Sequence, residues 1–323
     1  MTEKLKFSKE FFLSLILTAF ALFLAFFGGY GYAVTDGLKL WACVIIPSLY
    51  PYFFITAVLS KFSTLERAFI KFSPVTKRLF GTGGITAYAF FMSALSGYPI
   101  GAKIICDLKN NGLISSAEGT KACVFCSTSS PAFTVTCVGK IMANSTIFGV
   151  ILYAINILCA LFSGVVFSLF IKGEKSSYSF SEKPLASSIL YDCVYQSVIS
   201  ILVVGGIMAL FSLISEVLLS LGVLFLPAKL LSFITGDFSV STAWCVGLLE
   251  STTGLKLLFK NGITFFALPI SAFVCGFGGV SVLLQSVAFL NKANIKTAPF
   301  LLGKIVQAVC GFVLGILFSV FFF

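Results

Sequence analysis

The chain has 323 residues, of which 58% are hydrophobic and only 11% are charged, and it contains no histidine. Its mean hydropathy of +1.05 excludes the soluble globular classes and predicts a polytopic membrane protein. The 22 Lys and Arg residues exceed the 12 Asp and Glu residues. They gather in short segments between apolar runs, as the positive-inside rule predicts, so nucleic acid is not expected as a partner.

The ten cysteines indicate neither a disulfide framework nor a metal site. Eight are scattered in or beside apolar segments, where cysteine behaves as a small hydrophobic residue. Cys123 and Cys126 form a lone C-x-x-C pair without a second pair or a histidine. No metal site and no cofactor is therefore expected.

The first apolar run, from about Phe11 to Phe27, is predicted to be an uncleaved membrane helix rather than a signal peptide. A loop at 28–37 follows, and a second span at about 38–59 is expected to kink at Pro47 and Pro51. Because Lys and Arg crowd residues 61–82 and the loop at 28–37 holds only Asp36, the charge rule places the N-terminus and residues 61–82 in the cytoplasm.

The run at 85–105 contains a sequence that an unbroken helix would avoid. Gly97 and Gly101 permit non-helical angles, and Pro99 lacks a backbone donor. At membrane depth, such backbone is tolerated only where it is buried in protein or faces a water-filled cavity. The stretch from Ser93 to Lys103 is therefore the first candidate binding site.

Whether residues 85–105 cross the membrane or return as a re-entrant hairpin stays open. Lys103, Lys109 and Lys121 follow the break, and a crossing would place these charges outside, so they favour the return. The next helix is expected to begin with a capping box from Ser115 to Glu118.

A second break is predicted at residues 127–131, where four small polar residues precede Pro131 in an apolar context. A long span from Ser145 to Ile171 follows. The hydrophilic segment at 172–188 is the clearest boundary in the chain and divides it into two halves.

The second half contains apolar runs at about 190–214, 217–234, 239–259, 265–289 and 299–323. The third of these runs carries Glu250, a carboxylate within a membrane segment, which is a functional candidate by default. The fourth carries the glycine-rich sequence from Cys275 to Ser281 and then Gln285.

The two halves resemble each other weakly. The segment that begins at Gly97 can be laid over the segment that begins at Gly279, since each reads as a glycine-marked break, an apolar helix and an Asn/Lys turn. The fold predicted is an all-α polytopic membrane helix bundle with two inverted repeats and discontinuous helices. Its units are residues 1–37, a first repeat at 38–171, a linker at 172–188 and a second repeat at 189–323.

Each candidate residue also has a simpler interpretation. Glu250 either takes part in binding or only caps a helix end and reaches water. Lys103 either neutralises an anionic substrate or anchors the chain at the cytoplasmic surface. The polar residues at 127–130 either bind a ligand or pack between helices. The predicted substrate-binding residues are Gly97, Tyr98, Pro99, Gly101, Lys103, Ser127, Thr128, Ser129, Ser130, Glu250, Ser251, Thr252, Thr253, Gly278, Gly279, Ser281 and Gln285.

Four short motifs of the chain, taken together and in this order, carry a resemblance to a known family. They are Leu95–Lys103, the Asn-Gly turn after it, Leu248–Glu250 with Gly254, and Phe277–Ser281 with Gln285. The chain resembles the YlbJ-type sporulation integral membrane proteins of endospore-forming bacteria, which carry the Gate (nucleoside-recognition) domain. The resemblance covers nearly the whole chain from about Leu38. It implies movement of a small metabolite, with dipicolinate the associated substrate, across a membrane during spore formation. Ser127 stands where similar proteins tend to carry Asn, a departure that bears on the substrate rather than on the fold.

The function expected is that of a membrane transporter or permease for a small, anionic, dipicolinate-like metabolite. The alternative is a non-transporting membrane protein that is needed structurally for spore assembly. An enzyme is not expected, since without histidine only Ser/Lys or carboxylate chemistry remains. The expected partners are a small-molecule substrate and the lipid bilayer of the bacterial cell membrane, and homo-oligomerisation is left open.

Overall fold

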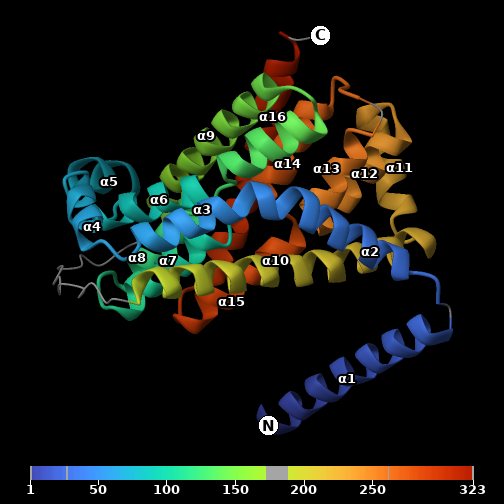
Figure 1. Cartoon of the computed structure of the whole chain (residues 1–323), viewed down its shortest axis with the longest axis horizontal. Coiled ribbons are helices and arrows are strands. Elements are labelled where there is room, and N and C mark those ends of the chain that lie inside the picture. The colour runs from blue at the N-terminus through green and yellow to red at the C-terminus, as the bar shows by residue number, and fades with distance from the viewer. Residues whose placement is uncertain (1, 27, 172–187, 261, 322–323) are drawn as a thin grey trace.

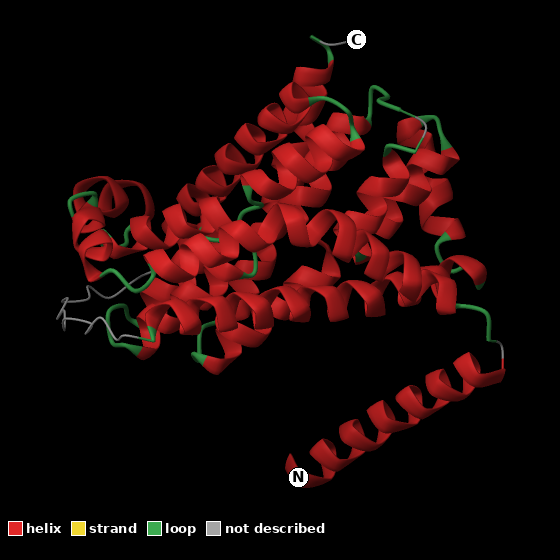
Figure 2. Ribbon diagram, viewed as in Figure 1, coloured by secondary structure: helices red, strands yellow, loops and turns green. Residues whose placement is uncertain are grey.

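The computed structural model of the chain describes residues 2–26, 28–171, 188–260 and 262–321. Within these ranges every regular element is a helix, which confirms the predicted all-α membrane bundle (Figures 1 and 2). The linker predicted at 172–188 lies, apart from Ser188, outside the described residues.

Five helices in the described ranges are long and apolar enough to cross a membrane: Gly31–Leu59, Thr146–Phe170, Ile189–Ser220, Ala267–Lys292 and Thr297–Ser319. Large apolar side chains such as Phe162, Leu202 and Val309 are exposed on their outer faces, as expected for contact with lipid. The helix predicted at 11–27 is α1 (Thr2–Phe26), which lies apart from the other helices (Figure 1).

The prediction of a loop at 28–37 is wrong for most of that segment. The chain is helical from Gly31, through α2 (Gly31–Leu40), a π-helical turn η1 (Trp41–Ile45) and α3 (Ile46–Leu59). The physical reason is packing against α10 (Ile189–Ser220), because a Cβ on Gly37 would lie 2.7 Å from Ser212 Oγ. Gly37 therefore allows close contact between α2 and α10 and does not mark a turn.

Two short helices, α4 (Ser63–Ile70) and α5 (Ser73–Phe80), lead to α6 (Ile85–Ser96), α7 (Ile100–Asn110) and α8 (Ser116–Phe125). The capping box predicted for α8 is confirmed, since Glu118 N donates to Ser115 Oγ at 3.1 Å. The axes of α5 and α6 make an angle of 84°.

The break predicted in the run at 85–105 is confirmed, and the chain turns back on itself there. Gly97 has φ +81° and ends α6. A Cβ on Gly101 of α7 would lie 2.5 Å from Ser93 Oγ of α6. Residues eight apart in a continuous helix are separated by about 12 Å, so α6 and α7 form a helical hairpin. This geometry agrees with the return that the lysine pattern favoured.

A second hairpin replaces the single span predicted at 239–259. The helix α12 (Phe238–Leu249) ends at Glu250, whose backbone is extended, and α13 (Ser251–Leu258) begins at once. Gly254 packs directly on the backbone of Gly247, so the two helices lie side by side. The short helix α11 (Phe225–Thr235) precedes this hairpin and packs on α12.

Each hairpin is followed by a broken helix and a long unbroken one. In the first half, α8 and the π-helix η2 (Ala132–Met142) run along α9 (Thr146–Phe170). Gly149 of α9 meets Gly139 of η2, and Gly164 of α9 meets Phe125 of α8. In the second half, α14 (Ala267–Phe277) and α15 (Gly279–Lys292) are followed by α16 (Thr297–Ser319), which packs on α14.

The element bounds favour a different repeat register from the one that lays Gly97 over Gly279. A shift of 153 residues carries Ile85–Ser96 (α6) onto Phe238–Leu249 (α12) and also lays α8 over α14, η2 over α15 and α9 over α16. The shift carries Gly101-Ala102-Lys103 onto Gly254-Leu255-Lys256. The register that lays Gly97 over Gly279 matches the first hairpin, α6–α7, with the broken helix α14–α15. The two were confused because each contains a glycine break followed by a polar turn. Inversion of the two halves stays a prediction.

The close contact at the first hairpin predicts that Gly101→Ala destabilises the protein. An added Cβ would overlap the backbone carbonyl of Cys126 and would also lie 2.8 Å from Ser93 Cβ, and neither atom can rotate out of the way. Overpacking of this kind costs about 1–3 kcal/mol. Thermal unfolding in detergent should show a lower midpoint for Gly101→Ala. Gly206→Ala is the control, because no atom lies within 4 Å of the added Cβ, and equal stability of the two variants would contradict the hairpin contact.

Candidate functional site

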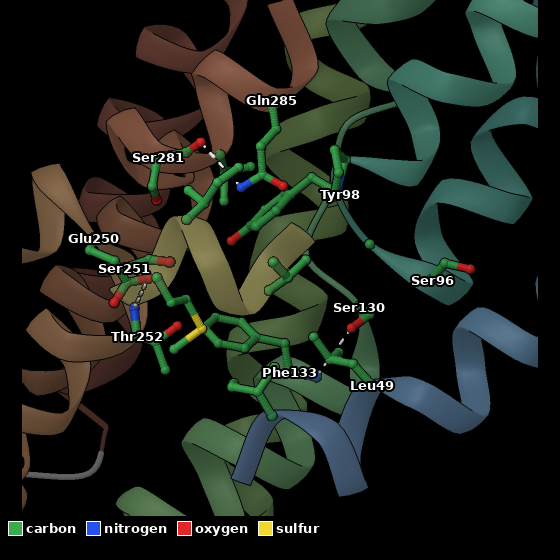
Figure 3. A pocket seen from close by; sticks show the side chains of 17 residues that line it. Leu49, Ser96, Tyr98, Ser130, Phe133, Glu250, Ser251, Thr252, Ser281 and Gln285 are labelled. Carbon is green, nitrogen blue, oxygen red and sulfur yellow. Dashed lines mark hydrogen bonds between the residues drawn. The ribbon is translucent and has the colours of Figure 1, made fainter. Parts of the chain in front are cut away.

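The helix breaks of both halves meet around one small cavity of about 50 Å³ (Figure 3). The two hairpins and the two broken helices all contribute to its lining, and apolar residues of the η1–α3 segment and of α10 complete it. The polar and break residues among them are Ser96, Gly97, Tyr98, Pro99, Ser130, Glu250, Ser251, Thr252, Ser281 and Gln285.

Four helices begin at this cavity. The residues Pro99, Pro131, Glu250 and Gly278 precede the first residues of α7, η2, α13 and α15, respectively. A helix N-terminus carries partial positive charge and free backbone N–H groups. The convergence of several such ends brings backbone N–H groups that suit an anion to the cavity, although the C-termini of α6 and α12 lie at the same breaks.

Glu250 caps one of these helix starts. Its Oε1 accepts from Thr252 N at 3.1 Å and its Oε2 from Thr253 N at 2.6 Å. The side chain is 2% exposed, and it lines the cavity. The simpler interpretation is therefore correct about the cap but not about water, since Glu250 is buried at the cavity; a role in binding stays a prediction.

Tyr98 joins the first hairpin to both broken helices. Its hydroxyl accepts from Ser129 Oγ at 2.9 Å, and Ser129 Oγ lies 3.3 Å from the carbonyl oxygen of Cys275 in α14. A Cβ on Gly278, where φ is +91°, would lie 3.8 Å from the Tyr98 ring. The break at Gly278 therefore meets the break at Gly97–Pro99 at this tyrosine.

The backbone of the second break, at residues 126–131, is satisfied by buried polar side chains from other helices. Thr128 N donates to Ser93 Oγ at 3.3 Å, and Ser129 N donates to Asn156 Oδ1 at 3.0 Å. The carbonyl oxygen of Ser127 accepts from Lys304 Nζ at 2.8 Å. Without these partners, each unpaired backbone group would cost several kcal/mol in an apolar environment.

Lys304, Gln307 and Asn156 were missed by the sequence prediction. All three are buried within long apolar helices, at 0%, 1% and 2% exposure. The signal that could have found them is a lysine or amide in the middle of a membrane span, the criterion that singled out Glu250. Lys304 and Gln307 lie on one face of α16 because they are three residues apart.

One polar atom at the cavity has no hydrogen-bond partner among the described residues. This atom is Gln285 Oε1, which is buried. Gln285 is held in place by its own amide nitrogen, which donates to the Ser281 carbonyl at 3.2 Å. Buried polar atoms in native proteins are nearly always paired, so Gln285 Oε1 is a candidate partner for a ligand or water at the cavity. The hydroxyl of Ser96 is also buried and unpaired, but it points away from the other lining side chains (Figure 3).

Lys103 lies away from the small cavity and lines a neighbouring groove of about 610 Å³. Lys292 also lines this groove, whose wall is formed largely by apolar residues of α10 and α15. The groove and the cavity share Pro99, Ile207 and Gln285, so the two spaces adjoin at these residues.

The structure brings together many, but not all, of the predicted binding residues. Nine of them line the cavity, whereas Thr128, Ser129, Thr253, Gly278 and Gly279 lie behind its wall. Gly101 and Ser127 serve contacts between helices. In the described ranges no group of three or more His, Cys, Asp or Glu residues could hold a metal ion.

Comparison with known proteins gives one relative of clear similarity. The chain is 27% identical over 306 residues to the sporulation integral membrane protein YlbJ of Bacillus subtilis (strain 168), covering 86% of this chain and 74% of the relative. The chain thus has a homologue among sporulation membrane proteins. This finding supports the YlbJ-type resemblance, whereas the Gate-domain assignment stays a prediction. No family model and no solved structure matches.

The capping geometry predicts that Glu250→Ala destabilises the second hairpin. The substitution removes the acceptor of two buried N–H groups at the start of α13, and losing such a cap costs about 1–2 kcal/mol. Thermal unfolding should show the loss for Glu250→Ala, and Glu250→Asp should retain part of the stability. A variant Glu250→Ala as stable as the wild type would mean that the cap contributes nothing.

Proposed function

We propose that the protein is a transporter for a small anionic metabolite and that the cavity at the helix breaks is its substrate site. The observation that carries the proposal is the meeting of four helix starts around a cavity that holds the unpaired Oε1 atom of Gln285. Secondary transporters characteristically bind substrates between broken helices near the membrane midplane.

Three features support an anionic substrate. The positive ends of α7, η2 and α15 face the cavity. The one carboxylate in its lining, Glu250, is matched by the backbone N–H groups of α13. Lys103 and Lys292 line the adjoining groove, where they would raise the local concentration of an anion. The resemblance to YlbJ-type proteins supports a dipicolinate-like substrate.

The volumes of the cavity and of the groove support a conformational cycle. A cavity of about 50 Å³ is too small for a metabolite, since sites for small molecules occupy about 300–1,000 Å³. The groove of about 610 Å³ falls in that range. A substrate would enter the groove from the side that carries the lysines, and the residues shared by the two spaces would move to admit it.

Under this proposal the protein is not an enzyme, and it works in a bacterial cell membrane with its N-terminus in the cytoplasm. The alternative function is a structural role in spore assembly without transport. The similarity to a sporulation membrane protein is compatible with both functions, so flux must decide between them.

Proteoliposomes that contain the wild-type protein are predicted to take up labelled dipicolinate saturably, and to take up a labelled nucleoside less well. Glu250→Gln should lose most of this flux, because the neutral amide cannot match the N-terminus of α13 as a carboxylate does. Uptake into vesicles with folded protein measures this directly. Absence of flux for both compounds would favour another substrate or the structural role.

Gln285→Leu is predicted to weaken substrate binding and to leave folding intact. Removal of one hydrogen-bonding partner of a buried ligand group costs roughly 1–3 kcal/mol, or about 5- to 150-fold in apparent affinity. The concentration dependence of uptake measures the change. Asn291→Leu is the matched control, since Asn291 is an exposed residue on the same helix. Equal uptake by both variants would show that Gln285 does not take part in substrate binding.

A further inference from the structure

The α16 helix carries a lysine at the centre of the protein. Lys304 is completely buried, within a segment that is apolar enough to cross a membrane. A lysine in such a place is costly unless its charge is compensated. Its Nζ donates to the carbonyl oxygen of Ser127 at 2.8 Å and to Gln307 Oε1 at 2.9 Å, and it lies 5.4 Å from the centroid of the Tyr98 ring.

No carboxylate is among these partners. A backbone carbonyl, an amide oxygen and an aromatic face are neutral groups that bind cations through partial negative charge. Ser127 follows the C-terminus of α8, where the helix dipole adds further negative potential. Carbonyl oxygens at the ends of discontinuous helices are also the ligands with which transporters hold coupling cations.

Gln307 is fixed as a ligand by a second set of contacts. Its Nε2 donates to the carbonyl oxygen of Val124 at 2.6 Å and to Ser163 Oγ at 3.1 Å. These two bonds turn Oε1 toward the ammonium and prevent an amide flip. The cage around the ammonium consists of the Ser127 carbonyl oxygen, Gln307 Oε1 and the face of the Tyr98 ring, and contacts from α8 and α9 fix its Gln307 oxygen.

We propose that Lys304 is a tethered cation that fills a monovalent-cation site at the break between α8 and η2, so that the protein needs no sodium ion. The covalently held ammonium occupies the oxygen cage permanently. Its positive charge offsets the partial negative charge at the C-terminus of α8. Its contact with the Tyr98 ring also fixes the turn between α6 and α7. The consequence for transport rests on the proposed function, but occupation of the cage does not.

The proposal is tested first on the purified wild-type protein and on Lys304→Ala by thermal unfolding. Sodium chloride is titrated against choline chloride at equal ionic strength. The wild type should show no difference between the salts, since its cage is full. Lys304→Ala should unfold at a lower temperature and regain stability saturably with Na⁺ or methylammonium, because a ligand that binds the folded state stabilises it. A wild type that Na⁺ stabilises over choline would overturn the proposal.

Lys304→Gln separates charge from hydrogen bonding. Glutamine supplies neutral N–H donors, so wild-type stability in this variant would show that the cage needs a donor and not a cation, which would also overturn the proposal. Lys296→Ala, at an exposed lysine just before the same helix, should respond to neither salt. If neither Lys304 variant can be purified, stabilisation of the wild type by Na⁺ over choline would still overturn the proposal.

Wild-type flux in sodium and choline buffers is the second test. Equal flux supports the proposal, whereas flux that requires Na⁺ contradicts it. Absence of flux in both buffers counts against the proposed function only, because the thermal measurements use no substrate.

Discussion

The need to pair every backbone N–H and C=O group away from water is the constraint on which this structure depends. Each broken helix exposes groups that a continuous helix would pair internally. At residues 126–131 the missing partners come from side chains of three other helices, namely Ser93, Asn156 and Lys304. The breaks can exist because buried polar side chains from distant parts of the sequence complete them, and these side chains in turn fix how α6, α9 and α16 pack.

Small residues make the same arrangement possible sterically. Gly101 allows the first hairpin to close against Ser93 and the chain at Cys126, and Gly254 allows the second to close against Gly247. Both glycines occupy the same position in the two halves when these are related by a shift of 153 residues. Close helix approach brings the hairpin tips to the cavity, so the shape of the site follows from glycine spacing as much as from its polar residues.

The sequence predicted those parts of the site that depend on local chemistry. Glycine and proline at 97–101, the polar run at 127–130 and the glycines at 276–279 marked three breaks, because each conflicts locally with an unbroken membrane helix. The sequence did not reveal which residues from elsewhere would complete the breaks. The roles of Lys304 and Asn156 arise from contacts over 177 and 27 positions, and such pairings have no local pattern. The hairpin at Glu250 was also missed, since hydropathy alone cannot distinguish 20 apolar residues that cross from 20 that return.

The two halves share their order of elements but not their buried polar contacts. Under the shift of 153 residues, Lys304, Gln307 and Asn156 correspond to Ile151, Ala154 and Val309. The three positions that would supply equivalent partners to the break at Gly278 are therefore apolar. Moving the first break would separate a buried ammonium from its acceptors, and leaving such a charge unpaired costs about 3–5 kcal/mol. Moving the second break separates no such pair, so under the proposed transport cycle the energetic asymmetry favours the Gly278 break and its neighbouring hairpin as the part that rearranges.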